Sequence, residues 1–440
     1  MTEVVIAESA LRQLVDTLHA DIERGAILFL NRNALAKSYL VHEVEIASPQ
    51  DILHSSATEI TFAPQFLVAV TRRARATGRS LAFVHTHPSG FPDFSMVDDA
   101  TERGLLDFLK ERNPEGHGFS IVLCDGIPVT RRFGTEERVS IRSVGDKITT
   151  FQDSAYALGA SNRYDRQIRA FGAEGQSVLR NLSIAIVGLG GTGSVAAQQL
   201  GHLGVGRFIL VDPDALEDTN LNRVVGTSDA SVGQEKIEIS MALIRQINPD
   251  AEVEPYKGSA MDPAAIELLK SVNAIFICTD SHVSRAHLSE FSYQYLIPAF
   301  DIGVSINARD GVVGAITGRT QMLAPGLPCL TCSNALDPKR IREELMTPEQ
   351  RAADPYFNEG GASQPAVISI NSAMVSMAVT MFLGAFTAIP VRARWQSYDA
   401  MSGTVRLLSA KPDVECPVCG PAGVVGVGDS RELTLVRREF

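Results

Sequence analysis

The stretch "VGLGGTGS", residues 187–194, follows the apolar run "LSIAI" and precedes a segment with helical character. Its glycines at 188, 190 and 193 fit the G-x-G-x-x-G spacing of a turn between a strand and a helix in a parallel sheet. Such glycines permit a tight turn and let backbone N–H groups approach a phosphate at the helix N-terminus. The strand "GRFILVDPD" follows the helix, so the pattern predicts an α/β domain with a Rossmann-like sheet that binds a nucleotide.

The residues after the turn indicate which nucleotide is bound. Asp212 ends the second strand and is the expected ribose-binding acid, as it would be in an NAD enzyme. The run "DPDALEDTNLNRVVGTSDASVGQEK" then supplies Asn220, Arg223 and Lys236, and two cations with an amide suit the triphosphate of ATP. Asp280 follows the strand "AIFICTD", where a carboxylate could hold Mg²⁺. Each charge taken alone could be a solvated surface group, but the five residues in order favour ATP.

Composition sets broad limits on the class of protein. The chain has 440 residues, enough for two or three domains, and a formal net charge of −11 makes a nucleic-acid partner unexpected. Its N-terminus lacks the basic start and small-residue cleavage site of a signal peptide. The uncharged segment 366–389 is long enough to span a membrane, but its recurrent Ser, Asn and Thr suit a buried helix better. We therefore expect a cytoplasmic protein with no membrane partner.

Four of the six cysteines form the pairs "CLTC" and "CPVC". The residues are Cys329, Cys332, Cys416 and Cys419. Two C-x-x-C pairs predict a closed tetrahedral zinc site with a structural role, with a redox pair or chance as the alternatives. Cys124 and Cys278 lie in apolar runs and are expected to be inert core residues.

The pattern of apolar segments divides the chain at about residue 145. We expect one α/β domain at residues 1–142, a polar linker at 143–160 and the nucleotide-binding domain at 161–440.

The first of these domains contains "HTHPSGFPDFSMVDD". His85 and His87 alternate at the end of a strand, so both imidazoles project from one side of it, while Asp98 falls one turn inside the next helix. Two His and one Asp make three zinc ligands and leave a fourth position for water, whose pKa zinc lowers. Ser95 is placed to cap the helix and to support a developing oxyanion, and Glu23 in "IERGAILFL" is the candidate general base.

The complete set is H-x-H-P with seven residues between His87 and Ser95 and two between Ser95 and Asp98. This set resembles the JAMM (JAB/MPN) metalloprotease family, and the likeness covers nearly all of residues 1–140. The resemblance implies a zinc isopeptidase that cuts after the C-terminal glycine of a ubiquitin-like protein. It assigns His85, His87 and Asp98 as ligands, Glu23 as acid/base and Ser95 as oxyanion helper. Some members of the family have lost these residues and act as scaffolds, whereas this chain keeps all of them.

Residues 161–420 resemble the ThiF-type adenylyltransferase family, which includes ubiquitin-activating enzymes and the molybdopterin and thiamine adenylyltransferases. The resemblance rests on "RYDRQIRAFGAEGQSVLRNLSIAIVGLGGTGS", "DPD…TNLNR…GQEK", "CTD", the two C-x-x-C pairs and "YDAMSG", in that order. It implies that Gly191 approaches the phosphates and Asp212 binds ribose. It also implies that Asn220, Arg223 and Lys236 hold the triphosphate and that Asp280 binds Mg²⁺. Its catalytic residues would be Arg223, Lys236 and Asp280. Arg166 would reach the γ-phosphate from the other protomer of a homodimer.

Together the two resemblances imply a bifunctional enzyme of a ubiquitin-like pathway, with a conjugating enzyme as a further partner. It would adenylate the C-terminal glycine of the small protein and hydrolyse bonds at that C-terminus. The alternative is processing and activation of a sulfur carrier for thiocarboxylate formation, and a third interpretation is a scaffold with one active half.

The segment "DPYFNEGGASQP" carries no cysteine where thioester-forming members of the family usually have one. Phe357 stands two residues before Glu359, and Ser363 offers only a hydroxyl. We therefore expect adenylation without a stable cysteine thioester on this chain.

Overall fold

The computed structural model describes residues 2–113, 116, 118–152, 162–309, 312–353 and 365–435. It divides into two compact units. The first comprises Met1–Ala155, Gln294–Leu296 and Val424–Glu432, and the second comprises Tyr156–Tyr293, Ile297–Gly423 and Leu433–Phe440.

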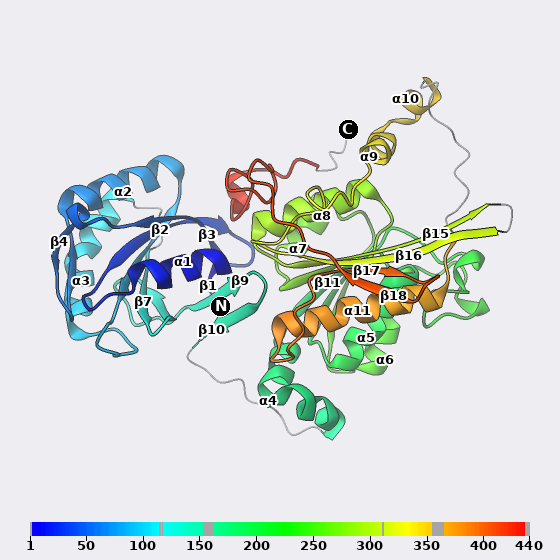
Figure 1. The fold of residues 1–440 in the computed structure, drawn as a ribbon, viewed down its shortest axis with the longest axis horizontal. Coiled ribbons are helices and arrows are strands. Elements are labelled where there is room, and N and C mark those ends of the chain that lie inside the picture. Colours follow the sequence, from blue (N-terminus) through cyan, green and yellow to red (C-terminus); the bar gives the residue numbers. More distant parts are fainter. Residues whose placement is uncertain are drawn as a thin grey trace. The chain divides into compact units, whose positions relative to one another are not determined.

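A mixed eight-stranded sheet with the order β10-β9-β1-β3-β2-β6-β7-β8 forms the first unit (Figure 1). Its strands are β1 (Glu3–Ala7), β2 (Gly25–Asn33), β3 (Ser38–Ile46), β6 (Ser80–Thr86), β7 (Gly118–Cys124), β8 (Ile127–Arg132), β9 (Ser140–Val144) and β10 (Ile148–Phe151). β4 (Ile52–Ser55) and β5 (Ile60–Phe62) form a separate two-stranded sheet. The helices are α1 (Glu8–Leu18), α2 (Pro64–Thr77) and α3 (Met96–Arg112).

Alternation along the strands gives this sheet two apolar faces. On β2, Leu28 and Leu30 belong to the core that also contains Leu14 of α1, whereas Ile27 and Phe29 belong to the core beneath α2. Successive side chains of a strand point to opposite faces, so a sheet covered on both sides needs apolar residues at nearly every position.

The expected linker at 143–160 is partly wrong. Residues 148–151 form β10, which pairs antiparallel with β9 and adds an edge strand to the first sheet. Val144 and Ile148 are buried, whereas Thr149 and Thr150 are exposed. The stretch is polar because this strand buries only a few of its side chains, so its composition resembles that of a linker.

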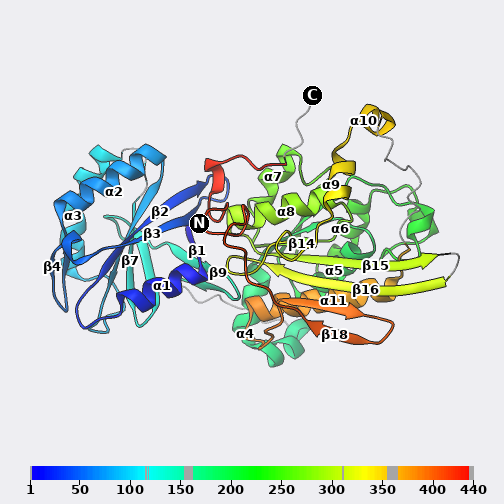
Figure 2. The same cartoon turned by 45° about the horizontal axis from the view of Figure 1, so that its top comes forward.

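A second eight-stranded sheet, with the order β13-β12-β11-β14-β15-β16-β17-β18, forms the second unit (Figures 1 and 2). Its strands are β11 (Ser183–Val187), β12 (Arg207–Val211), β13 (Glu252–Tyr256), β14 (Ala274–Ile277), β15 (Ala299–Arg309), β16 (Val312–Leu323), β17 (Trp395–Asp399) and β18 (Thr404–Leu407). The helices are α4 (Asp165–Asn181), α5 (Gly191–Leu203), α6 (Lys236–Ile247), α7 (Pro263–Leu269), α8 (His282–Tyr295), α9 (Pro338–Leu345), α10 (Pro348–Ala353) and α11 (Ile368–Phe386).

The first five strands of this sheet are parallel, and the last three are antiparallel. In chain order the parallel strands have the 3-2-1-4-5 arrangement of a Rossmann-like sheet, as the glycine turn predicts. Figure 1 shows α5, α6 and α11 on one face and α7 and α8 on the other. The carboxyl ends of β11 and β14, which are neighbours at the point where the strand order reverses, therefore lie at the expected ligand site.

Helix α11 is the one described helix that is long and apolar enough to cross a membrane, by length and composition alone. It packs against α5, β15 and β16 within the second unit. Met374, Ala378, Phe382 and Ala385 are among the side chains that it buries there. These contacts make α11 a core helix of the second unit.

Candidate functional site

A cavity of about 1080 Å³ lies in the second unit at the carboxyl ends of β11, β12 and β14. Eight of the residues that the sequence predicts for a nucleotide site line it. They are Gly188, Gly190, Gly191, Asp212, Asn220, Arg223, Lys236 and Asp280. Residues far apart in the sequence thus meet at one site, as a doubly wound sheet requires.

At two positions of the glycine turn another backbone segment lies so close that only glycine fits. Gly188 has φ +87°, and a Cβ on it would lie 2.8 Å from the carbonyl carbon of Cys278. A Cβ on Gly193 would lie 1.8 Å from the carbonyl oxygen of Gly188. Gly193 is therefore required for packing α5 against the turn, and it does not line the cavity.

Asp212 holds the turn in place. One carboxylate oxygen accepts a hydrogen bond from Leu189 N–H at 2.6 Å, and the other accepts one from Asp214 N–H at 2.9 Å. Only 4% of the residue is exposed, and burial raises its pKa above the ordinary value. Each carboxylate oxygen keeps a second lone pair, so the group can still accept from a ribose hydroxyl.

The basic residues of the cavity are anchored to neighbouring oxygens. Lys236, the first residue of α6, places Nζ 2.8 Å from Asp214 Oδ2. The Arg223 guanidinium donates to the carbonyl oxygen of Thr219 at 2.6 Å. Both cations face the cavity from fixed positions, which suits recognition of a polyphosphate.

Asp280 is exposed at the cavity beside the N-terminus of α8. Glu344 of α9 occupies that N-terminus, because its carboxylate accepts hydrogen bonds from the N–H groups of His282 at 3.0 Å and Val283 at 2.9 Å. Asp280 is left facing the cavity, where a carboxylate fits a divalent cation.

A buried charge cluster that the sequence motifs do not include also borders the cavity. Asp301 is 0% exposed and forms ion pairs with Arg319 and Arg285. Arg285 also donates to the carbonyl oxygens of Thr279 at 3.1 Å and Ile302 at 2.7 Å. The arginines line the cavity, and the carboxylate behind them fixes their positions.

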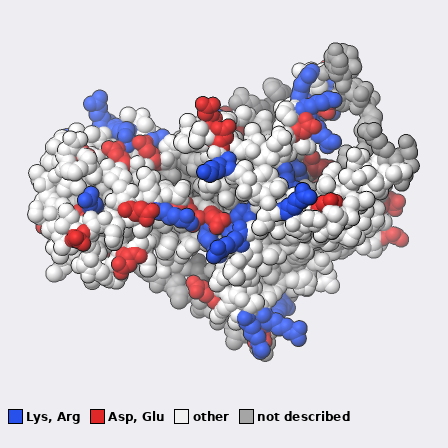
Figure 3. Space-filling view, in the orientation of Figure 1, with Lys and Arg blue, Asp and Glu red and all other residues white. Residues whose placement is uncertain are grey.

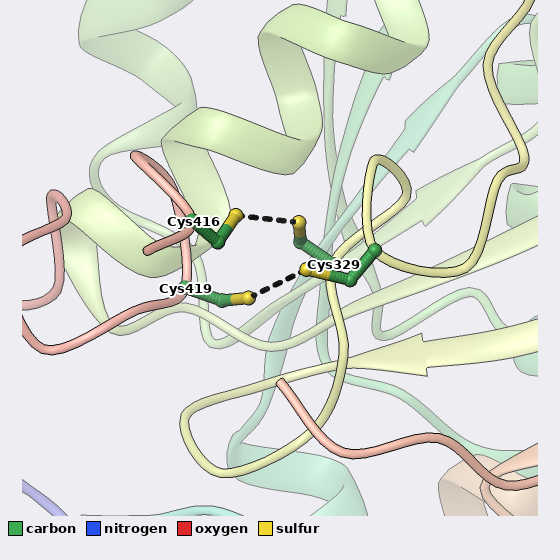
Figure 4. A group of neighbouring side chains, drawn as sticks. Cys329, Cys416 and Cys419 are labelled. Carbon is green, nitrogen blue, oxygen red and sulfur yellow. Dashed lines mark hydrogen bonds between the residues drawn. The ribbon is translucent and has the colours of Figure 1, made fainter. Parts of the chain in front are cut away.

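The four predicted cysteines of the second unit converge (Figure 4). The Sγ atoms of Cys329 and Cys416 are 3.6 Å apart, those of Cys332 and Cys419 are 3.5 Å apart, and all four lie within 4.8 Å of one another. Tetrahedral zinc with Zn–S bonds of about 2.3 Å needs S···S separations of about 3.8 Å. The four thiols fit that ion, and they join two segments that are distant in the sequence.

A second cluster of metal-ligating side chains lies in the first unit, where β6 ends and α3 begins. The Nε2 atoms of His85 and His87 are 3.2 Å apart. Asp98 places Oδ1 3.0 Å from Nε2 of His85 and Oδ2 3.3 Å from Nε2 of His87. These separations suit one small cation with nitrogen and oxygen ligands. Burial alone would raise the pKa of Asp98, but hydrogen bonds from the two imidazoles outweigh it and lower the pKa well below its usual value.

Glu23 and Ser95 flank this cluster. Glu23 is 2% exposed, its Oε1 lies 3.9 Å from His87 Nε2, and burial raises its pKa. Ser95 is the N-cap of α3, as predicted: its Oγ accepts from Asp98 N–H at 3.2 Å, and its own N–H donates to Asp98 Oδ2 at 2.6 Å. This reciprocal pair fixes Asp98 beside the histidines.

Arg166 lies on α4, away from the cavity lining of its own chain, and is exposed. Basic side chains gather over α4 in the view of Figure 3. The acyl-acceptor positions Phe357, Glu359 and Ser363 lie outside the described residues.

The sequence profile of the ThiF family matches residues 164–418, which include the cavity and the four-cysteine cluster. The chain belongs to the ThiF family. Residues 1–163, with the His85 cluster, precede the matched part.

Named relatives of the ThiF part include two bacterial proteins. Molybdopterin-synthase adenylyltransferase of Salmonella typhimurium is 31% identical over 260 residues, which cover 59% of this chain and 96% of that protein. Sulfur carrier protein adenylyltransferase of Thermus thermophilus is 29% identical over 261 residues, which cover 59% of this chain and 90% of that protein. Among solved structures, MccB of Escherichia coli has a TM-score of 0.48 and 20% identity, over 61% of this chain and 75% of that one.

Proposed function

We propose that the ThiF part adenylates the C-terminal glycine of a small sulfur-carrier protein with ATP. The observation that carries this proposal is the cavity that brings the glycine turn, Asp212, Arg223 and Lys236 together at the switch point of the sheet. The carrier as substrate is supported by the names of the two relatives, which are both adenylyltransferases, one of them acting on a sulfur carrier protein. These names favour activation of a sulfur carrier, the alternative interpretation of the sequence, over a ubiquitin-like pathway that includes a conjugating enzyme.

In the proposed reaction a carboxylate oxygen of the carrier attacks the α-phosphorus of ATP. The bond between that phosphorus and the oxygen bridging to the β-phosphate breaks, so the products are an acyl-adenylate and pyrophosphate. Arg223 and Lys236 would stabilise the charge of the departing pyrophosphate, and the N-terminus of α5 would hold the phosphates through its N–H groups. Asn220 lines the same part of the cavity, and Asp212 would accept from ribose.

Asp280 would hold Mg²⁺, since its exposed carboxylate faces the cavity and oxygen is the ligand that Mg²⁺ prefers. When bound, the ion would neutralise part of the triphosphate charge.

A homodimer would complete the site. Arg166 projects from α4 and is exposed, so we propose that it reaches the nucleotide of a second copy rather than its own.

The activated acyl group would leave for a thiol on another protein. Burial raises the pKa of the Cys278 thiol to about 12, so this thiol is not a thiolate near neutral pH. Cys124 belongs to the first unit, and burial raises its pKa as well. A non-reducing gel after incubation with ATP and carrier should show no thiol-sensitive adduct on this chain. An adduct on any of its cysteines would overturn this part of the proposal.

For the first unit we propose a zinc-dependent peptidase or isopeptidase that cuts after the C-terminal glycine of such a small protein. The arrangement of His85, His87 and Asp98 supports it, and these three residues would hold the ion. When bound, zinc would supply the Lewis acidity that makes water nucleophilic near neutral pH. Glu23 would take a proton from water and pass it to the leaving amine, and Ser95 would donate to the oxyanion.

ATP–pyrophosphate exchange tests the adenylation proposal. Exchange should require a carrier with an intact C-terminal glycine, and removal of that glycine should abolish it. Arg223→Ala should lower the exchange rate about 100-fold or more, the effect of removing one charge-stabilising donor. Exchange that is unaffected by Arg223→Ala would contradict the role given to this cavity.

A further inference from the structure

Asn371 is the one amide side chain of helix α11, whose other polar residues carry hydroxyl groups. It is 4% exposed and lines the cavity of the second unit. Its backbone N–H donates to the carbonyl oxygen of Val367 at 3.2 Å, whereas its side-chain amide has no hydrogen-bond partner among the described residues. The amide is not sealed from the cavity, so its N–H groups can donate to a ligand that enters there.

The neighbours of the amide place it at the phosphate end of the cavity. A Cβ on Gly191 would lie 2.2 Å from Nδ2 of Asn371 and 3.3 Å from Cγ of Arg223. Gly191 is the first residue of α5, whose N-terminal N–H groups and dipole attract an anion. The Asn371 amide and the Arg223 side chain therefore flank the start of this helix.

We propose that Asn371 is a phosphate-binding residue that donates from Nδ2 to a non-bridging oxygen of the nucleotide's phosphate chain. The amide would then gain the hydrogen bond that the protein does not supply. This inference rests on the proposed adenylation function and adds a ligand-contacting residue from a helix that the nucleotide motifs do not include.

Nucleotide binding to the full chain, measured by calorimetry with Mg-ATP and separately with adenosine, tests this inference. Asn371→Ala should weaken Mg-ATP binding about 10-fold, the range for a hydrogen bond to a charged group, and leave adenosine binding unchanged. Asn371→Asp should weaken Mg-ATP binding further, because a carboxylate would face the phosphates.

Ser376→Ala is the matched control on the same helix. Ser376 Oγ accepts from Gln199 at 2.9 Å and does not line the cavity, so neither ligand should bind differently. The inference is overturned if Asn371→Ala leaves Mg-ATP affinity at the wild-type value, or if adenosine affinity falls by the same factor. Wild-type protein that fails to bind Mg-ATP at all would instead overturn the proposed function, and this inference with it.

Discussion

Asp98 Oδ1 lies 3.0 Å from Nε2 of His85, because the serine at the N-cap of α3 fixes the first turn of that helix against the end of β6. The adjacent carboxylate, Asp99, instead pairs with Arg131 at 2.7 Å. Two neighbouring acids of one helix thus have different partners, and they provide a matched test of the metal centre.

Asp98→Asn should lower zinc affinity in the first unit by more than about 100-fold. Removing a residue that only hydrogen-bonds to a metal ligand lowers metal affinity about 10- to 100-fold, and loss of a ligand itself should cost more. Asp99→Asn should leave zinc affinity unchanged. Competition with a chromophoric chelator measures both. Equal zinc affinity in Asp98→Asn and wild type would remove Asp98 from the ligand set.

Glu23→Gln should keep its zinc and lose cleavage. A general base contributes roughly 100- to 10,000-fold to rate, and the amide cannot accept the proton. The substrate is a carrier extended beyond its C-terminal glycine, and metal content is measured on the same sample. A Glu23→Gln protein that cleaves at the wild-type rate would show that another group is the base.

Cys416→Ser should release one zinc ion per chain and lower the melting temperature, since the four thiols join segments that are distant in sequence. Cys124→Ser is the control, because this cysteine is buried outside the cluster. Metal analysis with thermal unfolding reports both effects. Retention of the full zinc content by Cys416→Ser would rule out the Cys₄ site.

His287 gives the second unit a specific acid sensitivity. The residue is 0% exposed, and burial lowers its pKa to about 4, below the ordinary value of about 6.5. The unfolded chain therefore binds a proton that the folded chain does not, and stability is lost as pH falls from about 6.5 towards 4. The shift corresponds to roughly 3 kcal/mol. Urea unfolding at these two pH values measures the free energy of unfolding. This free energy should fall less in His287→Gln than in wild type as the pH is lowered. An equal fall in both proteins would show that His287 is not the source of the acid sensitivity.

The sequence predicted the parts of the sites that are local in the chain. In three motifs the spacing of the residues along the chain determines which of them meet. These are the glycine turn, the two C-x-x-C pairs and the His85–Asp98 motif, and the structure brings the members of each together. Charged residues after the second strand could be assigned to the cavity because carboxyl ends of parallel strands share one edge.

The remaining site residues depend on contacts that spacing does not encode. Asp301 and Arg319 meet only because β15 and β16 pair with a particular register. Asn371 reaches the cavity only through the packing of α11, and the sequence pattern predicted only that this residue belongs to a buried helix.

The central claim, that the ThiF part adenylates a carrier C-terminus, is tested most directly by intact-mass measurement of the carrier after incubation with the chain, Mg-ATP and inorganic pyrophosphatase. The carrier should become heavier by one adenylyl group, with no such species for Arg223→Ala or for carrier without its C-terminal glycine. A wild-type chain that consumes no ATP and leaves every candidate carrier at its original mass would contradict it.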